Sequence, residues 1–516
     1  MKLYRLFMSI HRILGTALSI LFLMWFLSGM VMMYRTYPSV SQEQRVQHSE
    51  RLAPCGVELP RQLPNGLTSL SLQQIAGRPV FLMTNNDLES QIDALTGQPI
   101  IRYSVEKLQA IVDRWQAPSA SISSSLPAKD SLGCPSVAPI TATLLDSLNE
   151  IDVWLIGAMP FKEFPIYHYL LNDGRGSELY LSSRTGRVLQ LTDRESRFWA
   201  WVGAIPHWIY ITQLRATGRQ PWTNTVLWLS GFGIFMIISG IVVGLHSLLS
   251  ARRRKKGGLS PYIMPLFRWH HLFGLFFGLF VLTWIFSGFM SLADAPQCLW
   301  PVHDERTARQ LYADTLKTER FRLDIDRVLT ADDVRRVEWM EMGLRPYYHV
   351  WTAGDEYLVD AADTVPRRVT LSEADCRMVV QRTHHASVRI TATMMNHYDN
   401  YYVSQKRMLP LPVCRVTVDD ADCSTYYINP RTGDSRYYNT NRRAGKWMYS
   451  GLHALNISFF IAHPTLRLIL MWILMLGGTI VSFTGLLLSL RYLRRKKRTF
   501  LLPLKGEKRC VPMFAY

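Results

Sequence analysis

Ile10-His11-Arg12-Ile13-Leu14-Gly15 opens an apolar run that continues to Met33. Trp269-His270-His271-Leu272-Phe273-Gly274 opens a second run of the same kind. Five residues are identical in the two runs, and the members of each pair are 259 positions apart: His11 and His270, Gly15 and Gly274, Trp25 and Trp284, Ser28 and Ser287, Gly29 and Gly288. An internal repeat of this kind indicates that the chain contains two related halves.

The shared residues fall on one face of a helix. Counted from the His, the first Gly, the Trp and the second Gly lie at roughly 40°, 320° and 0° on a helical wheel. A helix does not need a His, a Trp and two Gly on one face in order to cross a bilayer. A His inside a membrane span is costly without a partner. A helix–helix seam with a His at the interface explains one such stripe. Two stripes in register favour a shared ligand.

The composition predicts a membrane protein. The 516-residue chain is 48% hydrophobic and has 15 tryptophans. Four apolar runs, roughly 9–34, 222–249, 266–292 and 466–490, reach the length of about 20 residues that crosses a bilayer. The first run is too long in its apolar part, and lacks the small-residue cleavage site, for a removed signal peptide.

Basic clusters orient the predicted spans. Lys2, Arg5 and Arg12 accompany the first span, 252–256 follows the second, and 494–498 follows the fourth. The positive-inside rule places all three clusters in the cytoplasm. Much of the net charge of +18 lies in them, and no nucleic-acid motif is present, so we expect no nucleic-acid partner.

The predicted organisation is therefore an α-helical membrane protein with four transmembrane helices, arranged as two parallel tandem repeats, and with α+β domains outside the membrane. The segments are a tail with the first helix (1–34), an outside region (35–220), the second helix (221–250), a basic cytoplasmic loop (251–265), the third helix (266–292), a second outside region (293–465), the fourth helix (466–490) and a cytoplasmic tail (491–516).

Six of the seven cysteines fall in the outside regions, and Cys510 falls in the cytoplasmic tail. An even number outside suits an oxidising compartment and predicts three disulfides. The spacing of Cys414 and Cys423 predicts that they join across a hairpin. Cys55 and Cys134 are then the expected pair in the first region, and redox-active thiols are the alternative.

The outside regions repeat as well. Asp152-x-Trp154, Phe164-Pro165-Ile166 and Arg184-Thr185-Gly186 have counterparts 247 residues later, and Arg197-x3-Trp201-x5-His207 has its counterpart 246 residues later, at Arg443, Trp447 and His453. The predicted halves are 1–257 and 258–516. Strand–turn–strand units are expected at 179–189 and from 426 onward, with weaker examples at 93–97 and 360–363. Each half therefore has room for two α+β units, and a loop is expected at 117–138.

The His-Arg-x-x-Gly opening of a span, the run Asp399-x-Tyr401…Leu411-Pro412-Val413, the Thr-Gly hairpins and His453 before the last span resemble the PepSY-associated transmembrane family. The first half differs from this pattern at Trp154 and Pro206. The resemblance covers nearly the whole chain. It implies PepSY-like periplasmic domains and points to inner-membrane siderophore reductases that bind b-type haem.

Symmetry predicts how the histidines pair. Each half enters and leaves the membrane in the same sense, so the repeats are related by a pseudo-two-fold axis along the membrane normal. His11 then meets His270 near the cytoplasmic face, and His207 meets His453 near the periplasmic face. Two axial imidazoles per site suit six-coordinate haem b, so we expect two haems. Gly15 and Gly274, one turn after their histidines, are predicted to admit the ring.

Other residues have competing interpretations. Arg197 and Arg443 are candidates to pair with haem propionates, or they are ordinary interfacial anchors. His246, His271 and His463 lie near predicted helix ends and are alternative ligands. His384-His385 could bind a metal, but two histidines alone make a weak site.

These features predict an inner-membrane dihaem protein that reduces a periplasmic acceptor. The resemblance implies ferric iron in a siderophore as that acceptor. We find no acid–base or nucleophile constellation and therefore predict no catalytic side chain. The cytoplasmic segments are too short for a nucleotide or flavin domain, so the electron donor is expected to be a quinol or a cytoplasmic reductase. The alternatives are a haem-free membrane protein that binds or regulates a periplasmic partner, and an iron-uptake accessory permease.

Overall fold

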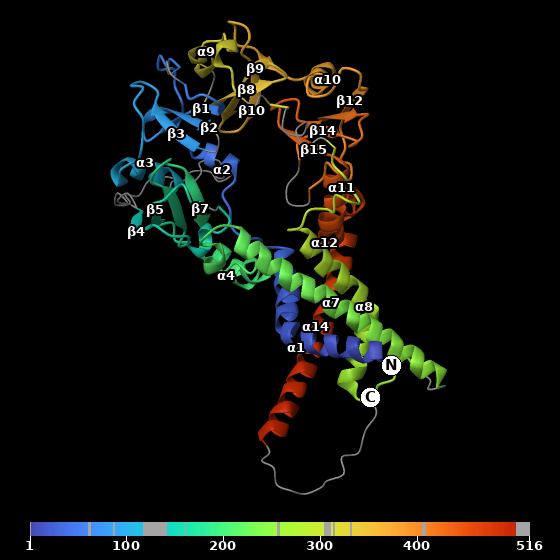
Figure 1. Ribbon diagram of the computed structural model, residues 1–516. Helices are drawn as coiled ribbons and strands as arrows, with labels where there is room; N and C mark the ends of the chain where they lie inside the picture. Colours follow the sequence, from blue (N-terminus) through green and yellow to red (C-terminus); the bar gives the residue numbers. More distant parts are fainter. Residues whose placement is uncertain are drawn as a thin grey trace, which may run out of the picture. The chain divides into compact units, whose positions relative to one another are not determined.

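The computed structural model describes residues 2–59, 63–85, 88–116, 142–158, 160–254, 258–303, 311–312, 315–330, 333–404 and 409–501 (Figure 1). Within it the chain forms two compact units. The first comprises Met1–Tyr34, Thr223–Ala293 and His463–Tyr516, and the second comprises Arg35–Trp222 and Asp294–Ala462. The predicted loop at 117–138, with Cys134, and the end of the cytoplasmic tail, with Cys510, lie outside the described residues.

Four long apolar helices make up the first unit: α1 (Lys2–Met32), α7 (Gln220–Arg253), α8 (Pro265–Met290) and α14 (Pro464–Leu501). They contain the four predicted spans. The shortest, α8, has 26 residues, and at 1.5 Å per residue it is roughly 39 Å long, enough for a hydrocarbon core of about 30 Å. Each helix is long and apolar enough to cross a membrane.

Glycines let these helices approach one another closely. Gly477 and Gly478 of α14 lie directly against the rings of Phe277 of α8 and Phe26 of α1, in positions where a Cβ atom would clash. Phe26 also contacts Trp284, with ring centres 5.5 Å apart. Small residues that admit bulky neighbours are typical of packing between membrane helices, so α14 is held against both α1 and α8.

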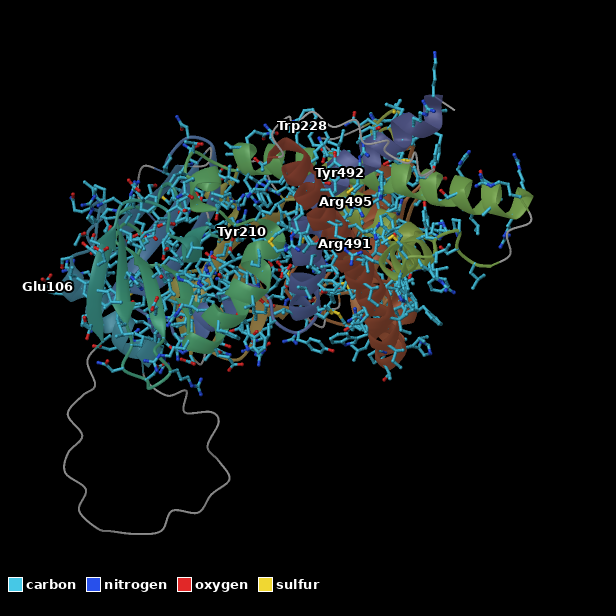
Figure 2. The ribbon with its side chains drawn as sticks, turned by 90° about the horizontal axis from the view of Figure 1, so that it is seen from below. Glu106, Tyr210, Trp228, Arg491, Tyr492 and Arg495 are labelled. Carbon is cyan, nitrogen blue, oxygen red and sulfur yellow. The ribbon has the colours of Figure 1, made fainter. Side chains whose placement is uncertain are left out.

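Basic and aromatic side chains gather along the last turns of α14, where Figure 2 shows Arg491, Tyr492 and Arg495. The guanidinium of Arg12, on α1, lies over the Tyr492 ring at 5.1 Å from its centre. Lys496 lies over the same ring at 5.5 Å from its centre, so Tyr492 contacts cations of two of the predicted basic clusters.

A seven-stranded antiparallel sheet dominates the second unit, with the order β11-β10-β9-β8-β1-β2-β3. Its strands are β1 (Leu67–Ile75), β2 (Arg78–Asn85), β3 (Leu88–Asp93), β8 (Val334–Met342), β9 (Arg345–Thr352), β10 (Glu356–Asp360) and β11 (Arg368–Val369). The predicted weaker turns at 93–97 and 360–363 follow β3 and β10. Both halves of the sequence therefore contribute to one sheet.

The two halves of this sheet correspond residue by residue. Arg78 pairs with Asp93 at 2.9 Å, and Arg345, 267 positions after Arg78, pairs with Asp360, 267 positions after Asp93, at 3.6 Å. The same offset holds where the halves meet. Leu70 lies opposite Trp339 and Leu72 opposite Val337, while Ser71 lies opposite Glu338, its own counterpart. The β1–β8 junction thus has a local two-fold arrangement.

Two further four-stranded antiparallel sheets have the same order of consecutive strands. One contains β4 (Thr143–Leu148), β5 (Ile166–Leu170), β6 (Glu178–Ser182) and β7 (Val188–Thr192), and the other contains β12 (Ile390–Met395), β13 (Val413–Val418), β14 (Thr425–Ile428) and β15 (Ser435–Tyr438). The predicted strand–turn–strand units are confirmed as β6–β7 and β14–β15. In each sheet a Tyr donates a hydrogen bond to the Asp of the repeated motif, Tyr180 to Asp152 at 3.0 Å and Tyr427 to Asp399 at 2.6 Å.

Short helices complete the second unit: α2 (Gln42–Gln47), α3 (Val105–Gln116), α4 (Arg194–Val202), α5 (Ala204–Trp208), α6 (Thr212–Arg215), α9 (Ile325–Leu329), α10 (Glu373–Gln381), α11 (Thr440–Lys446), α12 (Leu452–Ala454) and α13 (Ser458–Ala462). Buried side chains of β1, β2, β8 and β9 form one core, and those of α10, β13 and β14 form another. These cores support an α+β fold.

The predicted disulfide between Cys414 and Cys423 is wrong. Cys414 is fully buried on β13 and lies opposite Ile428 of β14, whereas Cys423 is exposed in the turn that joins these strands. The hairpin register therefore separates the two residues along the sheet. Cys414 instead contacts Cys376 of α10 through its thiol. The described residues contain no disulfide bond, so no partner for Cys55 is seen there.

Candidate functional site

His11 and His270 meet in the first unit, as predicted. His11 is on α1 and His270 on α8, and their ring centres are 6.1 Å apart with 37° between the planes. The two helices thus bring one imidazole from each half of the chain to the same place.

Both rings are fixed through the nitrogen nearer the backbone. His11 Nδ1 is 3.0 Å from the carbonyl oxygen of Met236 on α7, and His270 Nδ1 is 3.0 Å from Thr484 Oγ1 on α14. A carbonyl can only accept, so His11 carries its proton on Nδ1 and Nε2 is left with its lone pair. Hydrogen bonds of this kind orient the histidines that ligate metals.

Two glycines provide the space for these rings. A Cβ atom added to Gly240 of α7 would lie 2.5 Å from His11 Cε1, and one added to Gly485 of α14 would lie 3.3 Å from His270 Cε1. Gly240 and Gly485 are 245 positions apart, and each follows a hydroxyl residue, Ser239 or Thr484. They are equivalent in the two halves.

The predicted glycines next to the histidines are open. An added Cβ at Gly274 would meet nothing within 4 Å, and one at Gly15 would meet only the sulfur of Met236, at 3.9 Å. An added Cβ atom would therefore meet no imidazole at either position.

His207 and His453 meet in the second unit. His207 is on α5 and His453 on α12, and their ring centres are 6.2 Å apart with 70° between the planes. The structure therefore brings the two rings of each predicted pair next to each other. The Pro206 substitution, which distinguishes the first half from the second, does not displace His207 from this arrangement.

The chain makes a similar turn after each of these two histidines. Ile209 and Leu455, each two residues after its His, have left-handed conformations with φ of 52° and 51°. The next amide donates back to the helix in both places, Tyr210 to Ile205 at 2.9 Å and Asn456 to Ser450 at 3.0 Å. Positive φ is uncommon outside glycine, so the two halves share an unusual turn directly after the histidine.

The separation of the rings fits a metal held between them. An imidazole centre lies roughly 1.1 Å from its nitrogens and metal–imidazole bonds are about 2.0–2.1 Å, so two axial imidazoles have centres roughly 6.2–6.4 Å apart. The observed 6.1 Å and 6.2 Å are close to this value, and they also fall within the roughly 4.5–7 Å at which aromatic rings pack directly on one another. Within the described residues no cluster of three or more His, Cys, Asp and Glu could hold a metal ion. Two imidazoles alone suit a metal whose other ligands come from a macrocycle.

Arg197 and Arg443 differ in their surroundings. Arg197 pairs with Glu178 at 3.3 Å and donates to Thr192 and to the carbonyl of Gly176. A hydrogen bond from His168, together with Arg197, holds the pKa of the Glu178 carboxyl below its usual value. Arg197 is thus engaged within the protein.

Arg443 donates to the Thr425 hydroxyl at 2.6 Å and lies over the Tyr401 ring. It also lines an open, largely apolar hollow together with Trp300, Trp447 and Met448. Of the two arginines, Arg443 is therefore the one beside a space that a ligand can enter.

The alternative ligands have other contacts. His271 Nε2 lies 3.1 Å from the carbonyl of Gly244, which ties it to the α7–α8 seam. The His246 ring stacks on Tyr4 at 4.2 Å. His463 immediately precedes α14. His384 contacts the Tyr426 hydroxyl at 3.1 Å, and His385 gains no further ligands from the described residues.

Gly240, Gly485, Thr484 and the Met236 carbonyl were not predicted from the sequence. A signal was present, because Ser239-Gly240 and Thr484-Gly485 are 245 positions apart, the same offset that relates His246 to Arg491. The offset identifies equivalent positions but does not show that they face the histidines.

The fold and the site define a class: a protein with four apolar helices that can cross a membrane, α+β domains, and two inter-half histidine pairs. Comparison with known proteins does not take this further. No model of a known protein family matches the chain, and no curated protein is significantly similar to it.

Proposed function

We propose that the chain is a dihaem electron-transfer protein of the bacterial cytoplasmic membrane that reduces a periplasmic acceptor. The observation that supports it best is the pair of inter-half histidine couples, His11 with His270 and His207 with His453, at 6.1 Å and 6.2 Å. Each couple would hold one haem b. Haem iron, when bound, supplies one-electron chemistry, so no acid–base side chain is needed.

The proposal includes a tandem duplication. The reciprocal pairing of β1 with β8, the matched Tyr–Asp hydrogen bonds and the shared turns after His207 and His453 support it. Parallel repeats place equivalent residues at the same membrane depth. The histidine couples then belong to two levels, one near each face, and both termini are cytoplasmic with about 35–220 and 293–465 in the periplasm.

The residues of the chain have several tasks in this proposal. The histidines bind the iron, and the Met236 carbonyl and the Thr484 hydroxyl hold two of them in orientation. Gly15, Gly274, Gly240 and Gly485 leave space for the rings and for the flat ligand. Aromatic side chains of α1 and α8, such as Phe26 and Trp284, would exclude water from the site. Arg443 is available to a propionate, whereas Arg197 is bound to Glu178.

We infer the reaction partners from the resemblance to PepSY-associated siderophore reductases. The acceptor would be ferric iron in a siderophore, which needs one electron to be released as ferrous iron. The donor would be a membrane quinol or a cytoplasmic reductase. Lipid is the remaining partner, through the four apolar helices.

A visible absorption spectrum of the purified full-length protein tests the haem proposal. We expect a low-spin Soret band and about two haems per chain. His11→Ala or His270→Ala should remove one haem, and His453→Ala should remove the other and abolish reduction of an added ferric chelate. Absence of a Soret band would instead favour a haem-free protein that binds a periplasmic partner.

Topology has its own test. Reporter fusions at residues 130 and 256 should lie on opposite sides of the membrane. Fusions that report the same side would contradict the orientation, whether or not haem is bound.

A further inference from the structure

A polar cleft lies in the second unit, on the face of the seven-stranded sheet opposite its apolar core. It has a cavity volume of about 190 Å³. Ser69, Ser71 and Gln73, at alternate positions of β1, form part of its floor, because residues two apart in a strand share a face. The hairpin at Thr185–Val188, α2 and α3 form its walls.

Arginines from separate parts of the chain converge on this cleft. Arg45 comes from α2, Arg187 from the β6–β7 hairpin and Arg336 from β8, directly opposite Gln73. Glu163 pairs with Arg187 at 3.0 Å, and Glu338 pairs with Arg336 at 3.4 Å. Neither of these two glutamates lines the cleft, but Glu50 and Glu89 do, and Glu50 is paired with Arg114, a fourth arginine of the cleft, at 3.1 Å.

Among the described residues, Arg45 has no carboxylate partner. It donates Nε to the carbonyl of Val188 at 2.8 Å, and it forms no ion pair within the described part of the chain. Burial, and then repulsion from Arg187, lowers the pKa of the Arg45 guanidinium. Arg336 has an Nε atom that is buried without a partner among the described residues. A partly buried charge that lacks a counter-ion is costly, and an anion in the cleft would remove that cost.

Beside the second Thr-Gly hairpin, apolar side chains fill the position that corresponds to the cleft. At an offset of 267, Gln73 and Gln91 correspond to Met340 and Leu358, and these apolar side chains pack against Gly433 of the second Thr-Gly hairpin. Arg187 corresponds, at an offset of 247, to Asp434. The first Thr-Gly hairpin thus faces hydrogen-bonding groups and arginines, one of which, Arg336, comes from the second half, whereas the second hairpin faces apolar side chains.

We propose that this cleft is a binding site for a small hydroxycarboxylate. Its carboxylates would contact the three guanidinium groups, which match planar oxyanions, and its hydroxyls would bond to the serine and glutamine side chains of β1. The volume limits the ligand to the size of a metabolite, below the roughly 300–1,000 Å³ of sites for larger ligands. The site does not depend on haem.

Calorimetric titration of the full-length protein in nanodiscs, at physiological ionic strength, tests this site. Citrate is the probe, with inorganic phosphate and glycerol as comparisons. We expect citrate to bind, phosphate to bind at least tenfold more weakly, and glycerol to give no heat. Arg45→Gln should weaken citrate binding about tenfold or more, since a hydrogen bond to a charged group contributes about 1.5–3 kcal/mol.

Arg102→Gln, at an exposed arginine outside the cleft, is the matched control and should leave citrate binding unchanged. Gln73→Met reproduces the apolar residue of the second half and should abolish binding without loss of thermal stability. No citrate binding by the wild type, equal binding of phosphate, or equal losses in Arg45→Gln and Arg102→Gln would overturn the proposal. The haem spectrum should be the same in every variant, so failure here is separable from failure of the haem proposal.

Discussion

Replacement of Gly240 by alanine is expected to remove one haem, whereas the same change at Gly485 is expected to be tolerated. A Cβ at Gly240 would lie 2.5 Å from His11 Cε1, although ordinary contacts begin at 3.4 Å. The ring, or the helix that carries it, must therefore move by the difference, about 0.9 Å. Metal–ligand distances tolerate about 0.2 Å, so the His11 bond to iron should be lost.

At Gly485 the added Cβ would lie 3.3 Å from His270 Cε1, and a movement of about 0.1 Å relieves the contact. This variant should keep both haems. Gly231→Ala, on the same helix as Gly240 and with nothing within 4 Å of its added Cβ, controls for the loss of a helix glycine. Haem per chain, measured after extraction as the pyridine complex, should fall from about two to about one only in Gly240→Ala. Two haems retained in that variant, or an equal loss in Gly485→Ala, would refute the assignment.

Three other expectations concern stability and crosslinking. Mass mapping of the unreduced protein should find Cys376 joined to Cys414, because their thiols touch in the core and the compartment is expected to be oxidising. A link from Cys414 to any other cysteine would contradict this prediction. Burial lowers the pKa of Lys446 in the folded protein to about 8. Between about pH 8 and about 10.4, the ordinary pKa of a lysine, the unfolded chain therefore binds more protons than the folded one. The free energy of unfolding should rise with pH across that interval. Denaturant titrations should show this slope in the wild type and lose it in Lys446→Met. Gly478→Ala should lower the thermal unfolding temperature by several degrees, because its Cβ meets a phenylalanine ring, while Gly288→Ala, which meets nothing, should not.

Features that repeat along the sequence were the ones that could be predicted. The four spans follow from apolar length, and the hairpin at 179–189 from its turn residues. The pairing of His11 with His270 required only the offset of 259 and the assumption that equivalent residues share a depth. The structure places these rings together, as it does His207 and His453.

Features set by long-range register could not be predicted. Cys414 and Cys423 are close in sequence, but the pairing of Cys414 with Ile428 carries them apart. The contact of Cys414 with Cys376 depends on how α10 packs on β13, which no local pattern encodes. The role of Gly240 was missed for a similar reason, since a glycine in an apolar helix does not indicate which neighbour it admits.

The join between β1 and β8 has a consequence for how such a chain can originate. A polypeptide of half this length would carry one of these strands as an uncovered edge, which invites association with another chain. Because Leu70 faces Trp339 while Leu72 faces Val337, around Ser71 and Glu338, two identical copies could satisfy that edge reciprocally and close as a dimer. Fusion of two such copies into one gene would preserve the contact, and afterwards each copy could diverge alone. The arginine cleft, present beside one Thr-Gly hairpin and filled beside the other, is a difference of the kind that a fused pair can acquire.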